Sequence, residues 1–277
     1  MSHPMKADDV SRLLSADEVP PVLEENVRGA SPLLLTCDHY GRLFPRALGD
    51  LGVSESERQR HIAWDIGIAG VVQRLAKSLD AHLIAQRYSR LVIDCNRPPG
   101  VPSSIPVLSE ATPIPGNENL APAAAEARRI AIFQPYHDRI AQVLDQRARE
   151  RRPTILLAMH SFTPVYAGVA RPWHIGTLYN RDKRLATMLL RLLHAEGDLV
   201  VGDNQPYAAS DTTDYAIPVH AERRGLIHTG IEIRQDLIAD AAGQHAWAER
   251  LTRIFKQVLE ESGELGLIVG DPADPAL

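Results

Sequence analysis

The chain has 277 residues, of which 44% are hydrophobic and 23% charged, and its formal net charge is −5. This composition is ordinary for a globular protein, and the chain is long enough to bury a sizeable core. A weak negative charge without a dominant basic patch argues against binding to nucleic acid or to an anionic membrane, so we expect neither partner.

Short apolar runs alternate with longer amphipathic stretches along the chain. The runs predict strands at 32–37, 82–86, 91–95, 154–159, 199–202 and 228–233. Helical spacing of apolar residues predicts helices at about 54–80, 122–150, 182–196 and 243–262. The first helix begins with a capping box, Ser54 and Glu57, and the second is interrupted by Pro135. Buried strands that alternate with helices favour an α/β fold, a mainly parallel mixed sheet flanked by helices on both faces.

The segment 97–122 is rich in proline and has no periodicity, which is typical of a functional loop or a lid. No linker or repeat divides the chain, so we expect a single domain over 1–277, with its core at about 30–262. No glycine-rich phosphate-binding pattern follows any predicted strand, and nucleotide binding is therefore not expected.

The cellular location is predicted from three features. The N-terminus has no apolar core like that of a signal peptide, and no window of 18 residues is apolar throughout. Cys37 and Cys95 each end an apolar run, as buried thiols do in a reducing compartment. We therefore expect a cytoplasmic protein.

Polar side chains gather at the ends of the predicted strands, where ligands bind in open α/β sheets. They are Asp38-His39 after the first strand, Arg90, Asp94, Asn96 and Arg97 around the third, His160-Ser161, Asp203-Asn204, and Glu232 with Arg234. A loop rich in polar residues would explain one such site but not five, and the pattern predicts an active site.

A metal centre is the first hypothesis for this site. His39 and His160 both follow buried runs, so both would meet at one edge of the sheet. Two imidazoles and one carboxylate leave a position open on zinc, as in hydrolytic centres. We choose Asp65, in the first predicted helix, as the carboxylate. His61, on the same helical face, and Asp38 are competing ligands.

A general base and an anion site complete the hypothesis. Glu232 lies between two isoleucines, where burial would tune its pKa for proton transfer; the alternative is an ion pair with Arg234 on the same strand face. Arg97 and Asn96 suit a substrate carboxylate. Arg90 would instead polarise the scissile carbonyl.

Eight segments together resemble the N-formylglutamate amidohydrolase family. They are CDHYGRLFP (37–45), AWDIG (63–67), YSRLVIDCNRP (88–98), IPGN (114–117), PYH (135–137), LLAMHSFTP (156–164), DNQPY (203–207) and HTGIEIRQD (228–236). The resemblance runs in one order from about 30 to 260. It implies a fold similar to those of the zinc carboxypeptidases and aspartoacylases.

The resemblance also implies an activity and roles for residues. The activity would be hydrolysis of the amide of a small anionic N-acyl amino acid such as N-formyl-L-glutamate, with one Zn²⁺ per chain. His39 and His160 would be metal ligands, Arg90 and Glu232 catalytic residues, and Asn96 and Arg97 the carboxylate-binding pair. Further substrate contacts are assigned to Arg171, Arg234, His137 and Asn204.

Two positions depart from the expected pattern. Arg42 stands where zinc carboxypeptidases have a glutamate ligand, which is why Asp65 is chosen, and Gln205 stands where we expect glutamate. A hydrolase for another N-acyl amino acid or a peptide end, and a carboxylate-binding protein without metal, remain as alternatives. The sequence makes no prediction of oligomeric state.

Overall fold

The computed structural model describes residues 13–264 of the chain. Residues 1–12, where no signal peptide is predicted, lie outside the described residues. Among the described helices, none combines the length and the apolar character that a membrane crossing requires.

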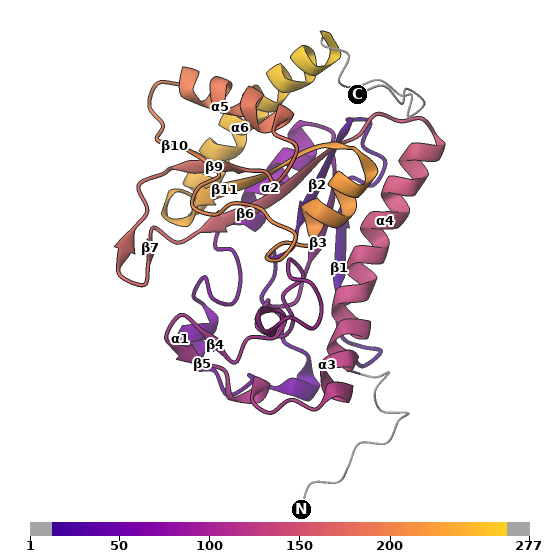
Figure 1. Cartoon of the computed structure of the whole chain (residues 1–277), viewed down its shortest axis with the longest axis vertical. Helices are drawn as coiled ribbons and strands as arrows, with labels where there is room; N and C mark the ends of the chain where they lie inside the picture. Colours follow the sequence, from indigo (N-terminus) through magenta and orange to yellow (C-terminus); the bar gives the residue numbers. More distant parts are fainter. Residues whose placement is uncertain (1–12, 265–277) are drawn as a thin grey trace, which may run out of the picture.

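A seven-stranded sheet forms the centre of the molecule (Figure 1), with the strand order β1-β3-β2-β6-β11-β9-β10. Its strands are β1 (Val22–Glu25), β2 (Leu33–Cys37), β3 (His82–Gln86), β6 (Ile155–Phe162), β9 (Ile175–Leu178), β10 (Val201–Asp203) and β11 (Ile227–Arg234). Neighbouring strands are parallel except at β1/β3 and β11/β9. The predicted mainly parallel mixed sheet is confirmed. Two small hairpins, β4 (Leu108–Ser109) with β5 (Thr112–Pro113) and β7 (Val165–Tyr166) with β8 (Val169–Ala170), lie outside it.

Helices cover both faces of this sheet, as predicted. The α-helices are α1 (Glu55–Arg58), α2 (Ile68–Ser78), α3 (Pro122–Arg128), α4 (Gln134–Arg149), α5 (Arg184–Ala195) and α6 (Ala241–Glu264). Short 3-10 and π segments are η2 (Arg46–Leu48), η3 (Pro102–Ser104), η4 (Pro115–Asn117), η5 (Arg129–Phe133), η6 (Ile217–Ala221), η7 (Glu222–Arg224) and η8 (Gln235–Leu237). One apolar core joins α2, α5 and α6 to one sheet face, and a second core joins α4 to the other. Figure 1 shows α4 along β1, away from α5 and α6.

The predicted strand at 91–95 is wrong, because this segment runs through turns. Its apolar side chains are buried like those of a strand. Its carbonyl groups, however, are satisfied by side chains: Asn117 donates to the carbonyl of Leu91 and Arg128 to that of Val92. Burial without ladder hydrogen bonds explains why the sequence looked like a strand.

The first predicted helix, 54–80, is divided in two. Ser54 caps α1, and its side chain accepts the N–H of Glu57 as the capping box requires. A turn then separates α1 from α2, which begins after Gly67. Asp65 therefore lies in a turn and not in a helix. The second predicted helix is divided into α3 and α4 by the π segment η5, which ends directly before α4, and Pro135 stands in the first turn of α4.

Candidate metal centre and active site

The candidate site lies at the carboxyl ends of β2, β6 and β11. In the sheet register Glu232 is paired with His160, and Thr36 with Ala158. Side chains two residues apart on a strand share a face. His160 and Glu232 therefore stand side by side on the face that α4 covers, and Asp38 follows Thr36 at the same level.

The turn before α2 brings Asp65 to these strand ends. The Asp65 N–H donates to the carbonyl of His39 (2.9 Å), and an Asp65 carboxylate oxygen accepts the Ser161 N–H (3.1 Å). Gly67 makes this turn possible. Its φ is +81°, and a Cβ there would lie 2.0 Å from the carbonyl oxygen of Ile238.

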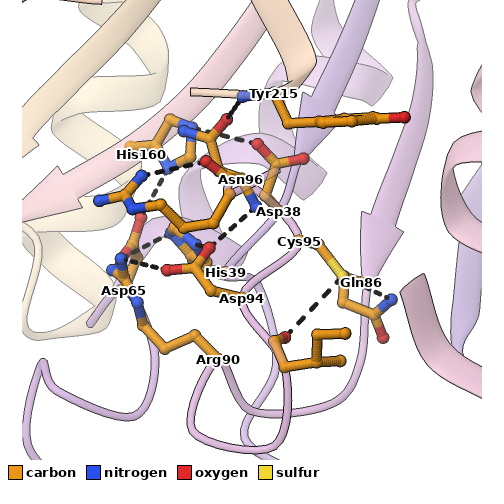
Figure 2. A network of polar contacts seen from close by, with 12 residues as sticks. Asp38, His39, Asp65, Gln86, Arg90, Asp94, Cys95, Asn96, His160 and Tyr215 are labelled. Atoms are coloured by element: carbon orange, nitrogen blue, oxygen red, sulfur yellow. Dashed lines mark hydrogen bonds and ion pairs between the residues drawn. The ribbon is translucent and has the colours of Figure 1, made fainter. Parts of the chain in front are cut away.

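His39, Asp65 and His160 form a buried cluster, shown in Figure 2. One ligand atom from each lies within 4.8 Å of the others. The Nδ1 atoms of His39 and His160 are 3.5 and 3.0 Å from the two carboxylate oxygens of Asp65. The Nδ1 atom of His39 is buried and makes no hydrogen bond. Two imidazole nitrogens and a carboxylate oxygen are donors that suit zinc, so these residues fit a metal ion.

Each histidine has a second carboxylate at its other ring nitrogen. The Nε2 atom of His39 is 2.7 Å from Asp94 Oδ1, and that of His160 is 3.5 Å from Asp38 Oδ2. Histidines that bind metals usually hold such a carboxylate on the second nitrogen, which orients the ring. The arrangement leaves both Nδ1 atoms free to face Asp65.

Charge in the cluster outweighs burial. Burial disfavours protonated histidine, and Arg90 adds to that effect, but Asp94 and Asp65 raise the pKa of His39. Burial also lowers the pKa of His160, but Asp38 and Asp65 outweigh this effect and raise the pKa well above its ordinary value. Burial would raise the pKa of the Asp65 carboxyl, yet the two histidines lower it. The carboxylates make the surroundings of the two histidines favourable for a positive charge, which suits a cation.

The competing ligands lie elsewhere. His61 is outside the cluster, with its Nε2 atom 3.4 Å from Glu110. Asp38 lies behind His160, on the side away from Asp65. Of the predicted choices, Asp65 is the carboxylate that the structure brings between the two histidines.

A cavity of about 520 Å³ opens beside the cluster. Its lining includes His39, Asp65, His160, Glu232, Arg90, Asp94, Asn96 and Arg97. Glu232 is 6% exposed and its Oε2 atom makes no hydrogen bond. Burial raises the pKa of Glu232 to about 7. The alternative pairing with Arg234 is not formed, because Arg234 pairs with Asp236 at 2.8 Å.

The predicted substrate-contacting residues of the 90–97 segment, Arg90, Asn96 and Arg97, have different partners. Arg90 contacts Asp94 at 2.8 Å and Asp65 at 3.5 Å. The Asn96 side chain accepts the N–H group of Tyr215 (Figure 2) and that of Ala216, and it donates to Asp214. Arg97 donates only to backbone carbonyl groups, and it forms no ion pair within the described part of the chain. Arg97 is therefore a cation that still lacks an anion.

Four predicted substrate contacts are absent from the cavity lining: Arg171, Arg234, His137 and Asn204. Arg171 contacts the cavity wall, because its guanidinium lies against the rings of Tyr166 and Tyr207 (4.6 and 4.7 Å to the centroids), which do line the cavity.

His137 and Asn204 have internal partners instead. Burial lowers the pKa of His137 to about 4, and its ring nitrogens lie 2.9 Å from His220 and 2.8 Å from the carbonyl of Cys95. Asn204 accepts the Tyr179 N–H at 2.8 Å from a left-handed backbone conformation (φ 49°), so it shapes a loop.

Sequence reasoning assigned no role to Glu110, Thr163, Tyr166 and Tyr207, which line the cavity. Thr163 stands in the HSFTP segment and Tyr207 in DNQPY. Both residues therefore lie in segments that the resemblance to the family had already singled out. Glu110 lies in the proline-rich loop, where only the length of the loop pointed to function.

The fold and the site together define an α/β protein with a buried two-histidine, one-carboxylate cluster beside a pocket at the carboxyl edge of its sheet. Comparison with known proteins is more specific. The family model described as N-formylglutamate amidohydrolase matches residues 31–239. The chain belongs to this family, and the resemblance seen in its motifs is confirmed.

Similar proteins include two named N-formylglutamate deformylases. That of Pseudomonas putida is 31% identical over 164 residues, 54% of this chain and 60% of the relative. That of Pseudomonas aeruginosa is 32% identical over 145 residues, 48% of this chain and 53% of the relative. The matched part is thus a little over half of the length of these relatives.

Two solved structures match over nearly their whole length. A gene product of Agrobacterium tumefaciens has a TM-score of 0.86 and 39% identity, over 90% of this chain and 99% of that one. An N-formylglutamate amidohydrolase from Ralstonia eutropha has a TM-score of 0.65 and 18% identity, over 88% and 98% of the two chains. The second match shows the likeness of fold.

Proposed function

We propose that this chain is a zinc-dependent amidohydrolase that hydrolyses an N-acyl amino acid, with N-formyl-L-glutamate as the reference substrate. One observation carries the proposal: His39, Asp65 and His160 lie together beside an unpartnered, buried Glu232. The names of the Pseudomonas relatives support the choice of substrate. The products would be a carboxylic acid and the free amino acid.

His39, Asp65 and His160 would hold one Zn²⁺ per chain. Zinc at this position would polarise the amide carbonyl and lower the pKa of water to about 7. Asp94 accepts from the Nε2 atom of His39, and Asp38 lies 3.5 Å from that of His160, so the two carboxylates would keep the imidazoles turned toward the ion.

Glu232 would act as the general base and then as the general acid. It takes a proton from the attacking water and delivers that proton to the nitrogen when the C–N bond breaks. Its pKa of about 7 suits both transfers near neutral pH. Arg90, fixed by Asp94 and Asp65, would donate to the carbonyl oxygen as negative charge develops there.

Two arginines would recognise the two carboxylates of the substrate. Arg97 lines the cavity without an acidic partner among the described residues, and with the second N–H of the Asn96 side-chain amide, whose first donates to Asp214, it would hold the α-carboxylate. Arg171 also forms no ion pair among the described residues, and it stands at two tyrosines of the cavity wall. We assign the side-chain carboxylate to Arg171, because Arg234 is already paired.

The substitution Glu232→Gln tests the proposal. We expect glutamate release from N-formyl-L-glutamate to fall by about 1,000-fold or more, because the base is lost, while zinc content by elemental analysis stays unchanged. The control is Glu249→Gln, an exposed glutamate of α6, which should keep full activity. Unchanged activity of the Glu232 variant would refute the role of this residue.

Metal dependence needs a separate measurement. Free amino acid release from a panel of N-acyl amino acids is followed with and without a chelator. Loss of release on chelation and its return with added zinc support the hydrolase. A chain that binds the substrate, contains no metal and releases nothing would be a carboxylate-binding protein.

A further inference from the structure

A second cavity, of about 780 Å³, adjoins the first. The two share four lining residues, His61, Glu110, Thr163 and Tyr166. We call these four residues the neck. They come from the turn after α1, the β4–β5 turn and the end of β6 with β7. In Figure 1, α1, β4 and β5 lie together below the sheet, and β7 projects to its left.

The neck begins next to the metal ligands. Thr163 lies three residues after His160 on the same strand end, and His61 lies four residues before Asp65 in the same turn. Neither Asn96 nor Arg97 lines the second cavity. A substrate whose α-carboxylate binds at Arg97 therefore has the second cavity open to another of its groups.

The two cavities together are larger than N-formylglutamate requires. This substrate has about a dozen non-hydrogen atoms, whereas drug-sized ligands occupy pockets of about 300–1,000 Å³. The first cavity alone, at about 520 Å³, is within that range. The additional 780 Å³ has no occupant if the acyl group is formyl.

The walls of the second cavity are suited to an uncharged group. Ile66, Ala111, Val165 and Ala167 contribute apolar surface. Arg60 is paired with both Glu57 and Glu110. Burial lowers the pKa of His61, which favours its neutral form. No cation without an acidic partner is therefore left for an anion among these described wall residues, and a carboxylate in the neck would meet Glu110.

We propose that the second cavity is the subsite for the acyl group, and that the preferred substrates carry an uncharged acyl chain longer than formyl. The inference rests on the proposed function and names its substrate class. The reaction is the same hydrolysis: water adds to the acyl carbon, the C–N bond breaks, the acyl group leaves as its carboxylic acid, and the amine nitrogen takes a proton.

The test compares N-formyl-, N-acetyl-, N-butyryl-, N-hexanoyl- and N-succinyl-glutamate on the wild-type zinc enzyme. Burial of each added methylene group predicts that kcat/KM rises about twofold to fourfold per carbon up to hexanoyl. The succinyl compound, which ends in a carboxylate, should be at least about tenfold poorer than the butyryl compound. Rates that fall steadily from formyl to hexanoyl overturn the inference.

The substitution Ala111→Trp fills the second cavity without entering the first, since Ala111 lines only the second. We expect kcat/KM for the hexanoyl substrate to fall about tenfold or more and that for the formyl substrate to stay unchanged. The matched control is Ala123→Trp, at an exposed alanine of α3 that lines neither cavity. Equal losses on both substrates would show that the variant is damaged and the subsite wrong.

The amino-acid side chain is the rival occupant. The Ala111 variant is therefore also assayed on N-formyl derivatives of alanine and norleucine. If the variant loses activity on the norleucine compound but not on the alanine compound, and loses no more on hexanoyl than on formyl substrates, the second cavity binds the amino-acid side chain. That result overturns the acyl assignment and leaves the proposed hydrolase activity intact. If no N-acyl amino acid is hydrolysed by wild-type enzyme reconstituted with zinc, the proposed function itself fails.

Discussion

Two buried histidine pairs in this protein have the same spacing and different surroundings. The ring centroids of His39 and His160 are 5.1 Å apart, and so are those of His137 and His220. The first pair is enclosed by carboxylates, and the second by the rings of Phe133 and Tyr215 and a backbone carbonyl group.

The two pairs consequently have opposite acid–base behaviour. In the first pair carboxylates raise the pKa of both rings in spite of burial. In the second pair burial lowers the pKa of His137 to about 4 and that of His220 to about 3. Burial and ring distance alone therefore do not identify a metal site. The carboxylates around the rings are what distinguish the cluster that could hold a metal ion.

The largest expected effect breaks the first pair. The substitution Asp65→Ala removes the carboxylate that both histidines contact. We expect loss of bound zinc and a fall of about 1,000-fold or more in kcat/KM for the best N-acyl substrate. Metal analysis and steady-state kinetics measure both. Asp138→Ala, at an exposed acid beside His137, should change neither. Full zinc content without Asp65 would contradict the metal assignment.

The next prediction concerns the second pair and pH. His137 is neutral in the folded protein down to about pH 4, whereas its unfolded-state pKa is 6.5. Between these values the unfolded chain binds the extra proton, so stability falls as pH falls from 6.5 to 4. The shift corresponds to a loss of about 3 kcal/mol.

Urea denaturation at several pH values checks this prediction. The His137→Gln variant should show a flatter fall in unfolding free energy than wild type over that window. The control, His245→Gln, replaces an exposed histidine and should follow wild type. Parallel curves for wild type and the His137 variant would show that His137 titrates normally in the folded state.

A smaller effect is expected at the carboxylates behind the two proposed histidine ligands. The substitution Asp94→Asn weakens the partner of the His39 ring, and we expect zinc affinity to fall about 10- to 100-fold. Competition with a chromophoric chelator measures the change. Asp38→Asn should cost less, because its contact with His160 is longer, at 3.5 Å. Equal zinc affinity of wild type and the two variants would show that neither carboxylate orients the histidine rings.

The sheet could be predicted where burial is continuous. The runs that became β2, β3, β6 and β11 are buried throughout or nearly so, as strands covered on both faces are. The strands β1 and β9 were not predicted, because each has four residues and no continuous apolar run. The false strand at 91–95 is explained by Asn117 and Arg128, which lie too far along the chain for a local pattern to show.

The candidate metal cluster could be predicted in part. Parallel strand ends share an edge, so His39 and His160 were expected to meet, and the structure brings them together. Asp65 reaches them from a turn that was taken for a helix. Arg234 and Asn204 lie at strand ends too, but nearby partners, Asp236 and the Tyr179 N–H, hold their side chains. Position in the chain does not reveal which way such a side chain turns.

Arg128 in α3 supports the candidate site from a distance. The residue is 1% exposed, its guanidinium donates to the carbonyl groups of Val92 and Gly116 and to the side chain of Asn117, and burial lowers its pKa to about 10. It thereby braces the irregular segment that carries Arg90 at one end and Asp94 near the other. A substitution of Arg128 would therefore disturb the positions of Arg90 and Asp94 from a distance, although neither of these residues is itself changed.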